Sequence, residues 1–177
     1  MSAPPAVSSL VEEFERAAVA TAATVERVPR SAAALNDALL RATAGCERIV
    51  FAEPEALPED LLALFRADPR IISNPSDDQL SLAQAGVTEA FAAVARTGSI
   101  CVRLRGMTAA DSLLAPLHVA LLRAETIVER PRELFDAGAA GLAQDFVFIT
   151  GPSATADMGP LVRGVHGPHR LHVIILE

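Results

Sequence analysis

The chain contains no lysine, so every basic side chain in it is an arginine. A Walker-type phosphate loop ends on a lysine and Schiff-base chemistry needs a lysine amine, so the sequence excludes both kinds of site. The formal net charge is −7 at pH 7. Because nucleic-acid binding starts from a basic face, this acidic balance argues against a nucleic-acid partner.

Cysteine and aromatic residues are also scarce. Cys46 and Cys101 are the two cysteines, and two thiols can neither build a disulfide framework nor hold an iron–sulfur cluster alone. Tryptophan and tyrosine are absent, so the core must consist mainly of leucine, valine, isoleucine and alanine. No apolar stretch approaches the roughly 18 residues of a membrane span, and no basic-then-apolar leader precedes the first expected helix. We therefore expect a cytoplasmic protein with no membrane partner.

Hydrophobic residues make up 51% of the 177 residues and charged residues 21%, which indicates a folded protein with a sizeable core. This length is typical of one domain. We expect residues 1–177 to form a single domain, with residues 1–8 frayed.

Apolar periodicity dominates the first part of the chain. Apolar residues recur at steps of three and four from Val7 to Val28, which predicts one helix that opens with a capping box at Ser9 and Glu12 and stops at Pro29. A second helix is predicted over residues 31–44.

The period then changes to that of strands. Residues 48–52 and 70–73 are short β-branched runs on either side of a helix predicted over 58–67, and this order implies a right-handed parallel crossover. Residues 86–104 are predicted to be two strands joined at Thr97-Gly98.

The second half is predicted to hold further strands over 117–122 and 126–128 and a helix over 132–140. Residues 145–149 and 171–176 are apolar without alternation, which is typical of central strands covered on both faces. The predicted fold is α/β, with a mostly parallel central sheet and helices on both faces.

The loop after residues 145–149 is a candidate binding site, because open parallel sheets bind ligands at the carboxyl ends of their strands. Gly151 permits an unusual backbone angle, while Ser153 and Thr155 offer hydroxyl groups. Backbone N–H groups in such a loop could hold a carboxylate or phosphate. The alternative is an ordinary connection that caps the next element.

Three of the four histidines lie close together, at His166, His169 and His172. Their spacing does not match the helical zinc pattern, and residues of an extended chain point to alternate faces, so we expect no metal site. His172 is predicted to be a hydrogen-bonded core or edge residue and His169 to be exposed. His166 lies among glycines, which suits either a projecting acid/base or a buried turn histidine.

A serine-hydrolase triad is a weaker possibility. Its members would be Ser112, Asp157 and either His118 or His166. The chain contains no G-x-S-x-G nucleophile elbow, which argues against this interpretation.

Four segments carry a family likeness. ITGPSATAD and VRGVHGPHRLHVIIL strongly resemble the closing signature of the LUD (lactate utilisation) domain family, particularly its small single-domain members of the lactate utilisation protein C type. GVTEAFAAVARTGSICV and SLLAPLHVALLRAETIV resemble its central segments. The likeness is close over residues 86–177, and the first half matches in its order of helices and strands.

The resemblance implies a fold like that of sugar-phosphate isomerases, CoA transferases and the formyltetrahydrofolate cyclo-ligase. It also implies a part in oxidising L-lactate to pyruvate together with two iron–sulfur subunits. On that basis we expect no cofactor on this chain alone, iron–sulfur clusters on partner subunits, and a small carboxylate or phosphate ligand.

The resemblance also implies a pocket that gathers residues from all four of these segments. His166 and Asp157 are its candidate catalytic residues. The candidate substrate-binding residues are Arg96, Thr97, Gly98, Ser99, His118, Gly151, Ser153, Thr155, Gly164 and Gly167.

Two other functions stay open. The chain could be a free-standing isomerase or nucleotide-dependent ligase on a sugar phosphate or folate, with His166 as acid/base and Asp157 as its partner. It could also be a non-catalytic assembly module with a vestigial pocket. We favour the lactate-oxidation subunit, on the resemblance.

The chain departs from the family pattern at two positions. The family usually has an acidic residue where Arg96 stands, and an arginine, the natural clamp for a carboxylate, where Ala154 stands. Our hypothesis is that Arg96 supplies the charge that position 154 lacks. Arg96→Glu combined with Ala154→Arg should then preserve ligand binding. A double variant that binds nothing, beside an Arg96→Ala variant that binds normally, would contradict this.

Overall fold

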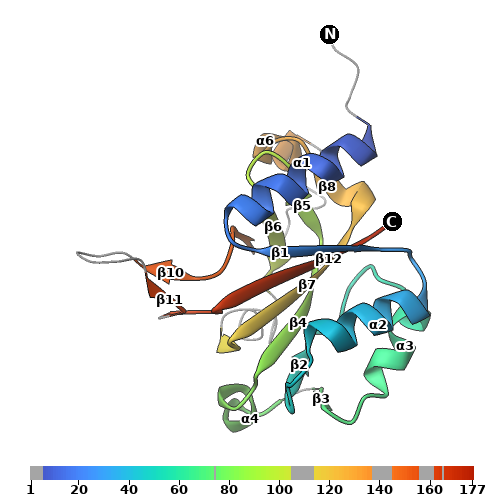
Figure 1. Ribbon diagram of the computed structural model, residues 1–177, viewed down its shortest axis with the longest axis vertical. Helices are drawn as coiled ribbons and strands as arrows, with labels where there is room; N and C mark the ends of the chain where they lie inside the picture. Colours follow the sequence, from blue (N-terminus) through green and yellow to red (C-terminus); the bar gives the residue numbers. More distant parts are fainter. Residues whose placement is uncertain (1–5, 74, 105–113, 137–144, 156–161, 165) are drawn as a thin grey trace.

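The computed structural model describes residues 6–73, 75–104, 114–136, 145–155, 162–164 and 166–177. Helices and strands alternate through the first half of the chain, and strands predominate in the second half (Figure 1). In chain order the elements are α1 (Val7–Ala20), β1 (Thr24–Val28), α2 (Ala32–Ala42), β2 (Ile49–Phe51), α3 (Glu59–Arg66), β3 (Ile71–Ile72), α4 (Asp77–Ser81), β4 (Ala85–Ala90), β5 (Ala92–Val94), β6 (Ser99–Arg103), β7 (Leu117–Arg123), the 3-10 helix η1 (Ala124–Thr126), β8 (Ile127–Val128), α6 (Pro131–Asp136), β9 (Phe146–Ile149), β10 (Ala154–Thr155), β11 (Val162–Arg163) and β12 (Arg170–Leu176).

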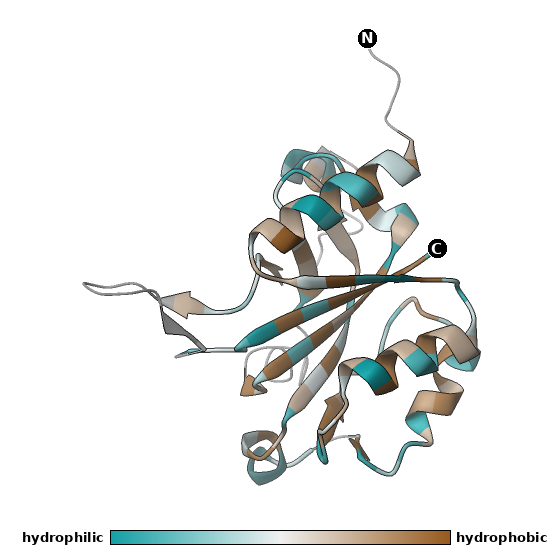
Figure 2. Cartoon of the chain, viewed as in Figure 1, coloured by the Kyte–Doolittle hydropathy of each residue, from teal (hydrophilic) through white to brown (hydrophobic). Residues whose placement is uncertain are grey.

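A six-stranded sheet forms the centre of the molecule, in the order β1-β12-β7-β4-β2-β3. All of its neighbouring strands are parallel, which confirms the predicted parallel sheet. β12 lies inside this sheet, and its side chains alternate between two cores: Ile174 and Leu176 belong to one, Val173 and Ile175 to the other. Hydrophobic residues accordingly recur along β12 and β7 in Figure 2.

Different layers cover the two faces of this sheet. On one face α2 and α3 pack their leucines and Phe65 against it. On the other face α1 packs together with a second, four-stranded sheet in the order β8-β5-β6-β9. Figure 1 shows α1, β5, β6 and β8 grouped on one side of the central strands, with α2 and α3 on the other. Helices therefore contribute to both faces as predicted, and the second sheet is an addition that the sequence did not predict.

Several local predictions are confirmed. The helix predicted over residues 31–44 is present as α2, and its N-cap Ser31 accepts a hydrogen bond from the N–H of Ala34 at 3.3 Å. β2 and β3 are parallel across α3. β5 and β6 form an antiparallel hairpin around Thr97-Gly98, although residues 86–104 also include most of β4, which joins the main sheet.

None of the helices that the structure describes has both the length and the apolar character that crossing a bilayer requires.

The predicted first helix is wrong at both ends. It starts at Val7 with Ala6 as N-cap, so Val7 and Ser8 are helical rather than frayed, and Ser9 donates to the Ala6 carbonyl instead of capping. It ends at Ala20, because the β-branched segment 24–28 pairs in parallel with β12 and becomes β1. Strand pairing with a distant segment outweighs the local periodicity.

The predicted central strand over residues 145–149 is also wrong. β9 is the edge strand of the second sheet, antiparallel to β6, and Phe148 is 38% exposed. Its run of apolar residues reflects aromatic packing, because the Phe146 ring lies 5.5 Å from that of Phe91 and 5.3 Å from that of Phe148 between centroids. The loop after β9 therefore does not leave the carboxyl edge of the parallel sheet.

Gly98 gives a test of how α1 is held on the second sheet. It has a φ of +65°, and a Cβ at this position would overlap the backbone of Ala17 and Ala18. Gly98→Ala should lower the free energy of unfolding by about 2–4 kcal/mol, combining a left-handed conformation with overpacking. Gly45→Ala is the matched control, since its φ is +79° and its Cβ would meet nothing within 4 Å. Urea unfolding followed by circular dichroism should show the larger loss for Gly98; equal losses would contradict this packing.

Candidate functional site

The loop after β9 and the segment before β12 enclose a cavity of about 430 Å³, which we call the histidine cavity. Several of the predicted site residues line it together. They are His118, Gly151, Ser153, His166 and Gly167. Thr150, Ala154, Pro168 and Leu171 are also among its lining residues.

Backbone hydrogen bonds hold the two loops together. The N–H of Ser153 donates to the Pro168 carbonyl at 2.9 Å, and the N–H of Gly164 donates to the Ser153 carbonyl at 2.9 Å. β10 and β11 pair antiparallel beyond this point. Because the Ser153 N–H is already used inside the protein, it is not a free donor for an anion, and this loop is a poorer anion cradle than the sequence suggested.

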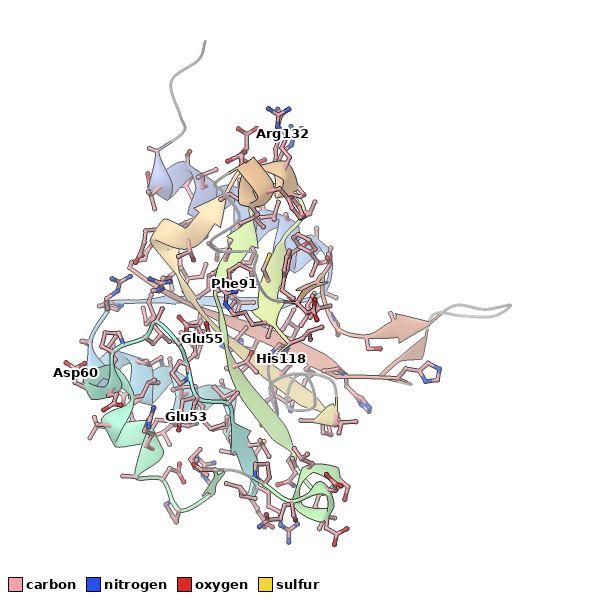
Figure 3. All side chains as sticks on the ribbon, turned by 180° about the vertical axis from the view of Figure 1, so that it is seen from behind. Glu53, Glu55, Asp60, Phe91, His118 and Arg132 are labelled. Carbon is pink, nitrogen blue, oxygen red and sulfur yellow. The ribbon has the colours of Figure 1, made fainter. Side chains whose placement is uncertain are left out.

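His118 is the buried member of the cavity wall. It lies on β7, is 1% exposed, and its Nε2 is 2.8 Å from Oγ1 of Thr88 on β4. Burial lowers the pKa of His118 to about 4, so the imidazole is neutral at pH 7. Its Nδ1 is buried and has no hydrogen-bond partner among the described residues. Figure 3 shows the side chain in the interior of the molecule.

His166 differs from His118 in being exposed, on the loop that leads into β12. The structure therefore favours a projecting imidazole over a buried turn histidine. Its predicted partner Asp157 lies outside the described residues, so the catalytic pair stays a prediction. The side chain of Thr155 is likewise outside the description.

A chain of hydroxyl groups connects the β5–β6 turn with the histidine cavity. Oγ1 of Thr97 lies 2.7 Å from Oγ of Ser99, which lies 2.7 Å from Oγ1 of Thr150. Thr150 lines the cavity, whereas Thr97 and Ser99 are not among its lining residues. These two predicted binding residues thus reach the cavity through Thr150.

Three of the four glycines predicted to bind substrate have packing roles. Gly98 lies against α1, and Gly151, with a φ of +70°, has no room for a Cβ beside the carbonyl of Thr21. Gly164, with a φ of +77°, lies against the ring of His169. The positive φ and the close approach both explain why glycine stands at these positions.

Arg96 does not come to the histidine cavity. Its guanidinium lies 3.8 Å from Glu129 and is half exposed, and it is not among the described lining residues. Ala154 does line the cavity. The hypothesis that Arg96 replaces a cation at position 154 therefore gains no support from this geometry and stays a prediction.

The other histidines are placed as predicted. His169 is exposed, and His172 is partly buried with its Nδ1 2.7 Å from Oγ1 of Thr24. Burial lowers the pKa of His172, although the nearby Glu26 opposes this. In the part of the chain that the structure describes, no three His, Cys, Asp or Glu side chains gather as metal ligands would.

Sequence reasoning missed a second cavity, of about 140 Å³, where β2, β4 and β7 end; we call it the Glu89 cavity. Glu89, Phe91, Arg103 and Arg123 are among its lining residues. A sequence signal existed, because Glu89 and Arg123 are single charges at the ends of apolar strands, VTEA and LHVALLR. This cavity lies at the edge where parallel sheets usually bind ligands.

Comparison with known proteins agrees with the fold. The family model described as the LUD domain matches residues 47–176. Lactate utilization protein C of Deinococcus radiodurans is 30% identical over 183 residues, an alignment that covers 98% of this chain and 82% of that protein. The crystal structure of a DUF162 family protein from Deinococcus radiodurans superposes with a TM-score of 0.75 at 25% identity, covering 98% of this chain and all of that one.

The buried His118 makes stability depend on pH. Its pKa is about 4 in the folded protein and 6.5 in an unperturbed state, so below pH 6.5 the unfolded chain takes up a proton that the folded protein excludes. The contribution of His118 to stability should therefore fall by about 3 kcal/mol as the pH drops from 6.5 to 4 and change no further below that.

The measurement is urea unfolding between pH 4 and 7 for the wild type, His118→Gln and His169→Gln. The His118→Gln protein should lose less stability on acidification than the wild type, whereas the exposed-histidine control should follow the wild type. Parallel pH curves for wild type and His118→Gln would contradict a buried neutral His118.

Proposed function

Because the chain belongs to the LUD domain family, we propose that it is a subunit of a cytoplasmic system that oxidises L-lactate to pyruvate, acting with iron–sulfur partner proteins. The observation that carries this proposal is the likeness to lactate utilization protein C of Deinococcus radiodurans, which extends over 98% of this chain. A likeness along nearly the whole chain supports a shared role better than a match of one motif would.

The need for partners follows from the redox chemistry. Oxidation of L-lactate to pyruvate removes two electrons and two protons, and a group must accept the electrons. Cys46 and Cys101 are buried in separate apolar clusters, and burial raises the pKa of Cys101 to about 12. Two such thiols cannot ligate one iron–sulfur cluster, so we assign the clusters to the partner subunits.

In this proposal the histidine cavity takes a small carboxylate or phosphate. His166 is its exposed acid/base candidate, with Asp157 as the expected partner. His118 supplies a neutral imidazole that is fixed by Thr88. An imidazole at the rim can exchange protons with solvent, whereas a buried neutral one can only accept or donate a hydrogen bond.

One observation favours a second function, a free-standing isomerase or nucleotide-dependent ligase. The histidine cavity, at about 430 Å³, is larger than a three-carbon acid needs and falls in the range of small-molecule sites. Such an enzyme would turn over a sugar phosphate or folate without partners. A non-catalytic assembly module is the third possibility, in which the cavity has no substrate.

Deletion of the gene tests the proposal. The deletion strain should fail to grow on L-lactate as sole carbon source and grow normally on pyruvate, because the defect lies in the oxidation step. The tagged wild-type chain should restore growth and co-purify with iron–sulfur proteins. Normal growth of the deletion strain on L-lactate would contradict the proposal.

Complementation with variants separates the three functions. His166→Ala should lower lactate-dependent dye reduction by about a hundredfold if His166 is a general acid/base, while the exposed His169→Ala should match the wild type. An assembly module predicts that His166→Ala retains turnover. Turnover of a sugar phosphate or folate by the purified chain alone would favour the free-standing enzyme.

A further inference from the structure

The Glu89 cavity lies at the carboxyl edge of the parallel sheet, away from the loops of the histidine cavity. Glu89 comes from the end of β4, Arg123 is the last residue of β7, and Ala52 directly follows β2. Arg103 at the end of β6 and Phe91 between β4 and β5 close it from the second sheet. Parallel strands diverge at this edge and leave room for ligands.

Glu89 is a buried carboxylate that is only half satisfied. Its side chain is 7% exposed. Oε2 accepts hydrogen bonds from the N–H of Glu55 at 2.7 Å and of Ala56 at 2.9 Å, which fixes the orientation of the carboxylate. Oε1 is buried and accepts no hydrogen bond from the described residues. A buried charged oxygen without a donor is unusual in a folded protein and calls for a bound partner.

Arg123 provides the complementary donor. Its Nε is buried and has no hydrogen-bond acceptor among the described residues. The distance from this Nε to Oε1 of Glu89 is 3.7 Å, which is too long for a direct hydrogen bond. A strong donor and a strong acceptor thus lie side by side on one cavity wall without satisfying each other. A ligand that accepts from Arg123 and donates to Glu89 would satisfy both.

The remaining wall sets the charge of the cavity. The guanidinium of Arg103 lies 4.3 Å from the Phe91 ring centroid, and its Nε is 3.1 Å from Oε2 of Glu55. Figure 3 shows Phe91 and Glu55 on neighbouring parts of the molecule. Each arginine of the wall lies close to a glutamate, and the third lining glutamate, Glu53, pairs with Arg66 outside the wall. These pairs leave the surroundings of the cavity nearly neutral. The dianion of a phosphate monoester has no proton on its phosphate to donate to Glu89 and brings two negative charges, so the wall favours a ligand that carries both a hydroxyl and a single negative charge.

The size of the cavity further limits the class of ligand that it can bind. It measures about 140 Å³. A protein cavity of about 150 Å³ holds benzene, which has as many heavy atoms as a three-carbon hydroxy acid. Sugar phosphates, folates and nucleotides exceed this volume, whereas a three-carbon hydroxy acid fits within it.

We propose that the Glu89 cavity binds a small 2-hydroxycarboxylate, whose hydroxyl donates to Oε1 of Glu89 and whose carboxylate accepts from Nε of Arg123. The choice of L-lactate as the compound to test rests on the proposed function. The site is separate from the histidine cavity and assigns roles to Glu89 and Arg123 that no motif of the sequence suggested.

Calorimetric titration of the purified full chain tests the two contacts with three compounds. L-lactate should bind. Propionate, which lacks the hydroxyl, and propane-1,2-diol, which lacks the carboxylate, should each bind at least about tenfold more weakly, because each leaves one buried group unpaired. No binding of L-lactate by the folded protein, or equal binding of propionate, would overturn the proposal.

Two variants locate the binding. Glu89→Gln and Arg123→Gln should each weaken L-lactate binding at least about tenfold. The control is Arg27→Gln, which removes a surface arginine of β1 that pairs with Glu177. Circular dichroism checks that each variant is folded. If Glu89→Gln does not fold, L-lactate binding by Arg123→Gln and the comparison of the three compounds still test the proposal. Unchanged binding in Arg123→Gln, or loss of binding in His166→Ala alone, would place the ligand elsewhere and overturn the proposal.

The outcome is independent of the test of the proposed function. A deletion strain that cannot use L-lactate, together with a purified chain that does not bind it, would leave the proposed function standing and remove this site. Binding that depends on Glu89 and Arg123, together with normal growth of the deletion strain, would establish the site and remove the proposed function.

Discussion

The structure depends on the parallel insertion of β12 between β1 and β7. Leu171 pairs with His118, and His172 pairs with Thr24, so one strand joins the first strand of the chain to the middle of the sheet. β12 also sends alternate side chains into both hydrophobic cores. The loop that carries His166 leads directly into this strand, and its position beside His118 is fixed by the same register. The histidine cavity is therefore a consequence of how the last strand is paired.

β7 connects the two cavities. His118, its second residue, lines the histidine cavity, and Arg123, its last residue, lines the Glu89 cavity. The two side chains project from opposite faces, because they are separated by an odd number of positions along an extended strand. Ala120 and Leu122 belong to one core and their neighbours to the other, so the apolar middle of the strand keeps the two polar sites apart. Each cavity can then differ in charge and exposure while sharing one rigid support.

The sequence predicted what depends on neighbouring residues and missed what depends on distant ones. The helix over residues 31–44 could be predicted because its apolar periodicity and its stop lie within the segment itself. Residues 24–28 were misassigned because their strand character comes from pairing with residues 172–176. The family motifs predicted that the loops at Gly151 and His166 lie together, and both line the histidine cavity. The rule for parallel sheets placed the Gly151 loop at the wrong edge, because β9, which precedes it, belongs to the second sheet and is antiparallel to β6. Glu89 was missed because an isolated charge in a strand resembles an ordinary surface residue until its partner on another strand is known.

The absence of lysine has a structural counterpart in the Glu89 cavity. A guanidinium is planar and carries donors on three nitrogens that point in different directions, whereas an ammonium is a single compact charge. Arg123 uses this shape: its Nη1 lies 3.9 Å from Glu125, while its Nε faces Glu89 inside the cavity at 3.7 Å. Arg103 likewise combines an ion pair to Glu55 with a flat contact on the Phe91 ring. A lysine at either position would have to give up one of these contacts. Arginine at both positions therefore keeps each positive charge of the wall beside a glutamate while Nε of Arg123 faces Glu89, as the proposed hydroxy-acid site requires.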